Sequence, residues 1–295
     1  MLKIQTIQFF RNGFIMILIN NQLKFSALMA ICFCVSSAAN AQQSQTSLPL
    51  WELGGFGVVT SQQAYPGSDQ QINRGLALPF FVYRGEFLRA ERDTAGVRAL
   101  KTPLYELDVS VAGAFGAGGD ELDARRGMPK LGTLVEFGPR LRLNLSDAES
   151  NPRWGLDLPV RGVFNLSDSL RPRGLKAEPT LTLRGSTDGN WRYTLGAGVL
   201  LADKKLSDTL YGVNPLYATP NRAAYEAGGG LMAWRLSGGV TKQIAQNLRL
   251  FAFTRFDFVA GAKNENSPLV RQKNGATVGL GLSYTWLRSS KSGQD

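Results

Sequence analysis

The sequence contains no histidine, and both of its cysteines, Cys32 and Cys34, lie near the N-terminus. Without histidine the chain cannot form a Ser-His catalytic pair or a histidine-ligated metal site. If the N-terminal segment is removed, neither a thiol nor a disulfide framework remains. The sequence therefore predicts a protein that is not an enzyme, because the usual acid–base group of catalysis is missing.

Long apolar runs and clusters of basic residues are also missing after residue 41. No stretch there approaches the roughly 18 apolar residues that indicate a membrane-spanning helix, although a membrane protein built from strands would show the same absence. The formal net charge of the chain is +10, but its cations are spread along the sequence. No basic patch predicts nucleic-acid binding, whereas attraction to anionic lipid or glycan surfaces stays open.

The N-terminus has the pattern of a targeting segment. An apolar run at 25–35 follows Lys24 and precedes an Ala-x-Ala site at 39–41. This order is typical of a secretory signal peptide, and the run is shorter than the roughly 20 apolar residues of a membrane anchor. The expected division of the chain is a cleaved signal peptide at 1–41, with Met16 as an alternative start, and one mature domain at 42–295.

The mature chain has a period of two in its hydrophobicity. Large apolar side chains alternate with polar ones along 131–145, and after a turn at 146–152 the alternation resumes along 153–166. This period is typical of an antiparallel hairpin with one apolar face. The other face carries frank charge of both signs. We expect most strands of the chain to share this division between an apolar and a charged face.

Twelve strands are predicted, or ten if 86–102 is a decorated loop. No linker or repeat divides them, so we expect one domain. The predicted strands are 51–61, 75–84, 86–92, 95–102, 105–115, 131–145, 153–166, 174–186, 191–203, 223–241, 248–262 and 275–287.

Three features favour a transmembrane antiparallel β-barrel over a soluble sandwich. Many of the strands are longer than the ~5–6 residues of soluble sheets and reach the ~9–11 tilted residues that cross lipid. Short connections alternate with long ones, as between the periplasmic turns and outer loops of such barrels. Four tryptophans fall at the short-turn rim, as an aromatic girdle should: Trp51, Trp154, Trp191 and Trp286.

The charged rows are expected to face the lumen of the barrel while the apolar rows face lipid. Because both signs occur at similar frequency, ion pairs that fill a narrow lumen are favoured over a pore with a mixed field. The predicted lumen-lining residues are Glu136, Arg140, Arg142, Asp157 and Arg184.

One acidic loop could in principle hold a metal ion. Asp120, Glu121 and Asp123 supply the oxygen ligands that calcium prefers. Their spacing is not that of an EF-hand, and Arg125 and Arg126 follow directly. We therefore expect a solvated loop, and the sequence predicts neither a metal nor a cofactor.

Seven short motifs occur in order along the mature chain. They lie at 65–69, 83–88, 126–129, 138–139, 158–161, 211–213 and 267–270. Together with the signal peptide, this order resembles the MipA/OmpV family of outer-membrane proteins over about 51–287. The motif positions that carry the resemblance are Tyr65, Gly67, Ser68, Gly127, Met128, Pro129, Arg161, Tyr211, Gly212, Ser267 and Pro268.

The resemblance implies a non-enzymatic protein in the outer membrane of a Gram-negative bacterium. It further implies a scaffold that links a lytic transglycosylase and a penicillin-binding protein in murein synthesis, with outer-membrane lipid around the barrel. A small-solute channel and a surface adhesin are the alternatives. The expected contact face for murein enzymes is the short-turn side, 146–152 and 242–247. Because most motif positions fall at the opposite side, they are expected to be structural turns folded over the barrel mouth.

Overall fold

The computed structural model describes residues 49–84, 88–90, 95–118 and 122–291. All of them lie in one compact unit, Ser47–Asp295. The predicted signal peptide at 1–41 lies outside the described residues, as do Asp120 and Glu121 of the acidic loop. In the part of the chain that is described, no helix is long and apolar enough to cross a membrane.

The described chain is built almost wholly from strands, which confirms the all-β prediction. Its strands are β1 (Trp51–Gln63), β2 (Gln71–Arg84), β3 (Leu88–Ala90), β4 (Ala95–Lys101), β5 (Tyr105–Gly118), β6 (Gly132–Asn144), β7 (Arg153–Asn165), β8 (Arg171–Ala177), β9 (Thr180–Ser186), β10 (Trp191–Ala202), β11 (Gly230–Ala245), β12 (Leu248–Phe258) and β13 (Asn274–Arg288). The helical elements are α2 (Lys204–Tyr211) and the single turns η2 (Asp123–Arg125), η3 (Leu166–Asp168) and η4 (Pro215–Tyr217).

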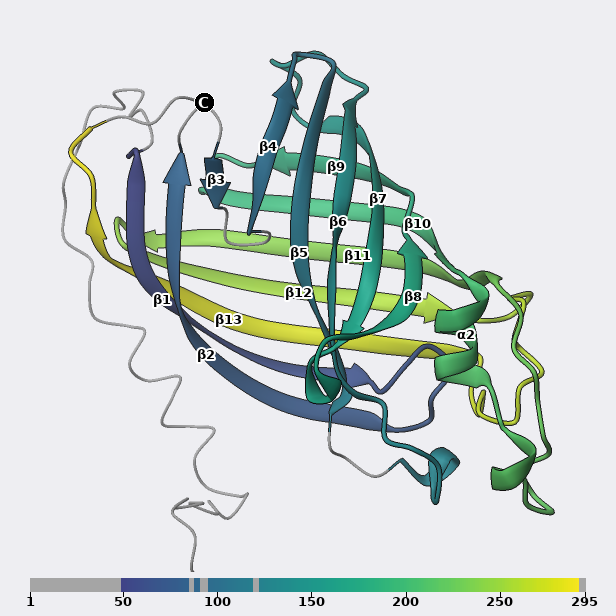
Figure 1. The fold of residues 1–295 in the computed structure, drawn as a ribbon. Helices are drawn as coiled ribbons and strands as arrows, with labels where there is room; N and C mark the ends of the chain where they lie inside the picture. The colour runs from purple at the N-terminus through teal and green to yellow at the C-terminus, as the bar shows by residue number, and fades with distance from the viewer. Residues whose placement is uncertain (1–48, 85–87, 91–94, 119–121, 292–295) are drawn as a thin grey trace, which may run out of the picture. The chain divides into compact units, whose positions relative to one another are not determined.

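The strands form one antiparallel sheet whose pairings run in a ring (Figure 1). Successive strands pair along the chain, and β13 returns to pair with β1. Both β8 and β9 lie between β7 and β10, which in turn pairs with β11. Between β2 and β5 the described wall consists of the short strands β3 and β4. A sheet that returns to its own first strand is the arrangement that lipid favours, because an unpaired backbone group in hydrocarbon costs several kcal/mol.

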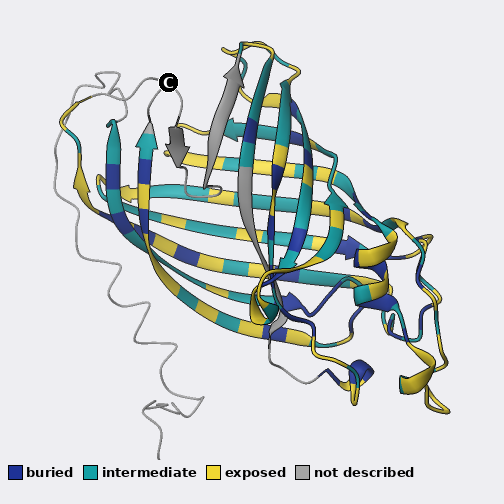
Figure 2. Cartoon of the chain, viewed as in Figure 1, coloured by how far each residue is buried: buried dark blue, intermediate teal, exposed yellow. Residues whose placement is uncertain are grey.

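The faces of this sheet are inverted relative to those of a soluble protein. Along β13, the even-numbered Leu280, Leu282 and Trp286 are more than half exposed. The odd-numbered Ser283 and Thr285 between them are buried. Figure 2 shows this alternation of exposed and covered residues along β11, β12 and β13. The outward face is therefore apolar and the inward face polar, as expected of strands in a lipid bilayer.

Several predicted strand boundaries were wrong. The predicted strand 223–241 begins later, at Gly230 of β11, and continues to Ala245. The predicted strand 174–186 is divided into β8 and β9, because Glu178 and Pro179 interrupt the ladder and proline cannot donate to it. The predicted loop 204–222 contains the helix α2, whose N-cap Asp203 accepts a hydrogen bond from the Leu206 amide.

The tryptophans lie at both rims of the sheet. Trp51 and Trp191 are the first residues of β1 and β10 and lie at the rim of short turns. Trp234 falls in the middle of the predicted strand 223–241, but the later start of β11 places it near the long-loop end, paired with Phe258. The opposite rim therefore also presents aromatic side chains to the outside.

The apolar core of the protein lies at the long-loop end of the sheet. Inward-facing residues there, such as Ile72, Leu134 and Val163, are buried together with residues of the four long connections. Those connections are 64–70, 119–131, 203–229 and 259–273. Figure 1 shows α2 at this end of the sheet, where it contacts β8 and β10. We call the packed part of the long connections the loop cap.

Candidate functional site

The lumen contains a group of ion pairs contributed by β5, β6, β7 and β9. Arg140 contacts Asp108 on the neighbouring strand through Nε, at 3.1 Å to both carboxylate oxygens. Arg142 lies between two acids, 3.6 Å from Glu106 and 3.3 Å from Asp157. Arg184 extends the series, because its guanidinium lies 2.6 Å from the second oxygen of Asp157.

A second group of ion pairs lies toward the loop cap. Glu136 binds Lys176 at 2.6 Å and lies 3.6 Å from Arg161. Lys176 also lies 3.4 Å from Glu178. Through Glu178 this group continues to Arg235 on β11, at 2.8 Å. The side chains of neighbouring strands thus form a chain of alternating charges along the inner wall.

Arg235 is the most enclosed cation of this second group. Its Nε donates to Asp257 at 2.6 Å and one terminal nitrogen donates to the second oxygen at 2.9 Å. The side chain of Arg235 is 7% exposed and that of Asp257 is 5% exposed. Paired bonds of this kind fix the guanidinium in one orientation. The geometry joins β11 to β12 and, through Glu178, to the connection between β8 and β9.

All five predicted lumen-lining residues lie in these ion-pair groups on the inward face. Sequence reasoning missed Lys176, Glu178 and Arg235 as members. The signal was present for the first two, because Lys176 and Glu178 alternate with apolar neighbours. Arg235 lies within the predicted strand 223–241 but was not assigned to the inward face. Whether the charges act only to hold the wall together or also contact a solute stays a prediction.

Three motif positions meet in the loop cap, although they come from distant parts of the chain. The Tyr65 hydroxyl donates to the Leu269 carbonyl at 2.8 Å, and the Tyr211 hydroxyl donates to the Pro66 carbonyl at 2.9 Å. The Ser267 hydroxyl donates to the Tyr211 carbonyl at 2.7 Å. The two tyrosine rings pack edge to face, with their centroids 6.0 Å apart. These contacts connect the loops 64–70, 203–229 and 259–273.

The neighbouring motif positions shape the turns that allow these contacts. Gly67 has a φ of +90°, and its carbonyl accepts hydrogen bonds from the amides of Arg271 and Gln272 at 2.8 and 3.2 Å. Only glycine adopts this φ at little cost. Ser68 is buried, and its carbonyl accepts a bond from Gln63 at 2.7 Å.

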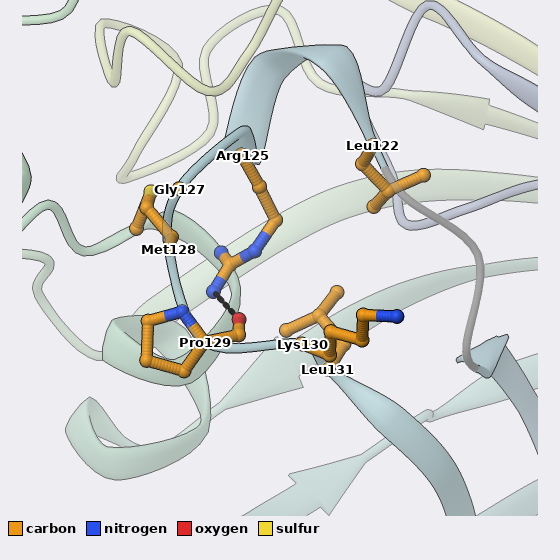
Figure 3. Close-up of a pocket in the computed structure, with 7 residues that line it drawn as sticks. All are labelled: Leu122, Arg125, Gly127, Met128, Pro129, Lys130 and Leu131. Atoms are coloured by element: carbon orange, nitrogen blue, oxygen red, sulfur yellow. Dashed lines mark hydrogen bonds between the residues drawn. The ribbon is translucent and has the colours of Figure 1, made fainter.

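The motif 126–129 forms one side of a small hollow in the cap (Figure 3). Gly127, Met128 and Pro129 line a cavity of about 50 Å³ together with Leu122, Arg125, Lys130 and Leu131. The buried Arg125 donates to the Leu210 carbonyl at 3.1 Å and to the Pro129 carbonyl at 3.5 Å. The hollow is large enough to hold a few water molecules.

The remaining motif positions do not share one site. Arg161 lies in the lumen beside Glu136, in the group of ion pairs nearer the cap. Gly212 follows the last turn of α2, and its amide donates to the Asp208 carbonyl at 2.9 Å. Pro268 lies between Ser267 and Leu269, both buried. Within the described ranges, no group of acidic side chains is arranged to hold a metal ion.

Arg222 is a cap residue that sequence reasoning missed. One terminal nitrogen donates to the carbonyls of Ala124 and Arg126, at 3.1 and 3.0 Å. The other donates to the Tyr217 carbonyl at 2.7 Å. A single arginine in a long loop gives no pattern that would reveal such bonds. Arg222 therefore fastens the loop 203–229 to the loop that precedes β6.

The buried tyrosines predict a pH dependence of the cap. Burial raises the pKa of Tyr65 to about 12 and also raises the pKa of Tyr211, because desolvation disfavours the phenolate. The folded cap therefore holds these protons more tightly than the unfolded chain, whose tyrosines titrate near 10. The contribution of these protonated tyrosines to the free energy of unfolding is fully present below pH ~10 and is lost as the pH rises through about 12.

A stability series in buffered detergent from pH 9 to 12 checks this expectation. The midpoint temperature of thermal unfolding should fall above pH ~10, while the phenolate absorbance stays low until the protein unfolds. Tyr65→Phe should reduce the loss because it removes one titrating group. An equal loss in wild type and variant would assign the pH dependence to other groups.

The chain matches a family model over most of its length. The model is described as MltA-interacting protein MipA and matches residues 54–286. No curated protein sequence matches the chain.

Solved structures of outer-membrane proteins are loosely similar. The NanC porin shares 8% identity with a TM-score of 0.36, over 80% of this chain and 98% of that chain. OprB of Pseudomonas putida shares 7% identity with a TM-score of 0.41, over 83% and 100%. Outer membrane phospholipase A from Escherichia coli shares 12% identity with a TM-score of 0.32, over 83% and 94%. The low TM-scores mean that the strands do not superpose closely.

Proposed function

Because the chain belongs to the MltA-interacting protein MipA family, we propose that it is a non-enzymatic scaffold for murein enzymes. Its location is the outer membrane of a Gram-negative bacterium, in keeping with an inverted sheet whose apolar side chains face outward. The proposed partners are a lytic transglycosylase, which the family name suggests, and a penicillin-binding protein. Residues 1–41 are proposed to direct export as a cleaved signal peptide.

We propose that the barrel has twelve strands. β8 and β9 follow one another in the same gap between β7 and β10, so together they count as one strand of the barrel. The short strands β3 and β4 count as two more, which a ten-strand barrel would lack. This count keeps both ends of the described chain at the short-turn rim, where the residue before β1 bonds to the residues after β13.

The observation that carries the proposal is the packed loop cap. Three of the long connections are joined by buried hydrogen bonds and aromatic contact, so the long-loop end offers little free passage. In outer-membrane barrels the short turns face the periplasm, where murein lies. The proposed contact face is therefore the short-turn rim at 146–152 and 242–247.

The residues of this rim offer polar, accessible groups to a partner. Asp147 and Glu149 are exposed in the connection from β6 to β7. Lys242 lies 4.8 Å from the centre of the Trp191 ring, so the cation is held beside an aromatic anchor. Aromatic anchors with a polar surround are typical of protein-binding surfaces. The lumen charges, in contrast, are largely enclosed.

Capture of murein hydrolases from a detergent extract tests the scaffold. Immobilised full-length protein should enrich a lytic transglycosylase over an unrelated outer-membrane barrel. Substituting Asp147, Glu149 and Lys242 together with alanine should weaken capture about tenfold or more, which corresponds to ~1.4 kcal/mol. A matched variant at the cap, Lys204→Ala with Glu226→Ala, should capture as wild type does. Equal capture by the unrelated barrel, or loss only in the cap variant, would count against the proposed contact face.

A further inference from the structure

The inner wall of the barrel is not charged all round. On β12, Phe251 and Phe253 pair with Gly281 and Gly279 of β13. These glycines alternate with the outward Leu280, so both phenylalanines face inward. Across β1 the same face continues to β2, where Leu78 pairs with Phe56. The middle of the inward face of β12, β13, β1 and β2, at Phe251, Phe253, Phe56 and Leu78, is thus apolar, with polar residues such as Asp257 and Ser283 beside it.

The aromatic rings lie flat against this wall. A Cβ built on Gly279 would overlap the ring of Phe253, and one on Gly281 would overlap the ring of Phe251. Each ring therefore covers the glycine of the neighbouring strand and does not project into the lumen.

Part of this inward apolar surface is accessible. Phe253 is 38% exposed and Leu78 is 46% exposed, although both lie on the inward face. Inward residues at the cap, such as Met232 at 2%, are closed off by comparison. Accessible apolar area inside the lumen costs about 25 cal/mol per Å², a cost that an apolar ligand would remove.

Cations lie beside the apolar wall toward the short-turn rim. Arg192 on β10 pairs with Thr241, which pairs in turn with Phe251, so the three residues form one row across the inner face. Arg249 precedes Phe251 by two residues on the same face and donates to Gln243 at 2.8 Å. The row thus joins a cationic end to an apolar surface.

We infer that the lumen binds an anionic amphiphile with one alkyl chain. Its carboxylate or phosphate head would lie near Arg192 and Arg249, and its chain would cover Phe251, Phe253 and Leu78. Charge complementarity sets this orientation, because the loop cap closes the other end. Entry is from the short-turn rim. This site adjoins the proposed scaffold surface at 242–247, but it is tested with a different ligand and different variants, so either proposal can fail without the other.

Displacement of a fluorescent fatty acid tests the inference. Full-length protein in phosphatidylcholine nanodiscs is titrated with 11-(dansylamino)undecanoic acid, and empty nanodiscs give the partition background. Saturable binding above this background should be displaced by dodecyl phosphate or dodecanoate. Dodecanol, which lacks the charge, and butyl phosphate, which lacks the chain, should each displace at least about tenfold more weakly. A difference between dodecyl phosphate and dodecanoate would identify the preferred head.

Matched variants separate the lumen from the outer surface. Phe253→Ala should weaken binding about tenfold, whereas Phe256→Ala, an outward aromatic on the same strand, should not. Arg192 is exposed. Arg192→Gln should lower the affinity for dodecyl phosphate and leave the affinity for dodecanol unchanged. A heat-modifiability gel verifies that each variant is folded. Binding that does not exceed the empty nanodiscs, or that is equal in wild type, Phe253→Ala and Arg192→Gln, would overturn the inference.

Discussion

Arg235→Met is expected to destabilise the folded barrel by about 3–5 kcal/mol, because removing one partner of an enclosed ion pair leaves uncompensated charge. The substitution keeps the length of the side chain but removes the guanidinium. Asp257 would lose two hydrogen bonds of 2.6 and 2.9 Å, and Glu178 would lose its contact at 2.8 Å. Methionine cannot replace any of these bonds.

Urea unfolding in detergent micelles, followed by the gel shift between folded and boiled protein, measures this effect. The exposed pair Lys204 and Glu226 provides the control, because its atoms also lie 2.6 Å apart but its side chains are 61% and 82% exposed. Lys204→Met should cost far less than Arg235→Met, because exposed ion pairs contribute little to stability. Combining Arg235→Met with Asp257→Asn and Glu178→Gln should recover much of the loss. If Arg235→Met costs no more than the surface control, the lumen is too hydrated for these pairs to matter.

The strand pattern could be predicted from the sequence because lipid imposes it on every residue. Along β6 and β7 the apolar and charged rows were predicted with their correct faces, since each residue position determines its face when the period is two. Glu136, Arg140 and Asp157 therefore fell on the inward side as expected. Which acid would pair with which arginine depends on the stagger between strands, which composition does not encode.

The loop cap could be predicted only in outline. Motif positions such as Tyr65, Tyr211 and Ser267 were expected to fold over the mouth. Their contacts join residues that lie 145 and 56 positions apart, and no local pattern reports such distances. α2 was missed for a related reason. Its short apolar face, Leu206 and Leu210, is interpretable only once the cap it packs against is known.

The inner wall of β12, β13, β1 and β2 was also missed. Phe251 and Phe253 have the appearance of lipid-facing residues in a strand already rich in phenylalanine. The register assigns them to the inside, opposite Gly281 and Gly279. A sequence scan for alternation gives equal weight to both faces when both are apolar. The alternate glycines of β13, Gly279 and Gly281, are the signal that could have shown which face the phenylalanines occupy.

Removing the central contacts of the cap is expected to open the barrel to ions. Tyr211 is 1% exposed, its hydroxyl donates to the Pro66 carbonyl, and its own carbonyl accepts from Ser267. Tyr211→Ala combined with Ser267→Ala removes the ring and two of the bonds that join three loops. Large-to-small changes at buried aromatic positions cost about 3–5 kcal/mol, which exceeds what a set of surface loops can absorb locally.

Planar-bilayer recording checks this expectation against the channel alternative. Wild-type protein should give no steady conductance, whereas the double variant should show long openings. Tyr217→Ala, in the same long loop but outside the buried core of the cap, should behave as wild type. Tyr211→Phe should also stay closed, because it keeps the ring and removes one hydrogen bond worth about 1 kcal/mol. Steady conductance by the wild type, lost on Arg140→Ala or Arg161→Ala, would instead mean that the lumen charges line an open path past the cap.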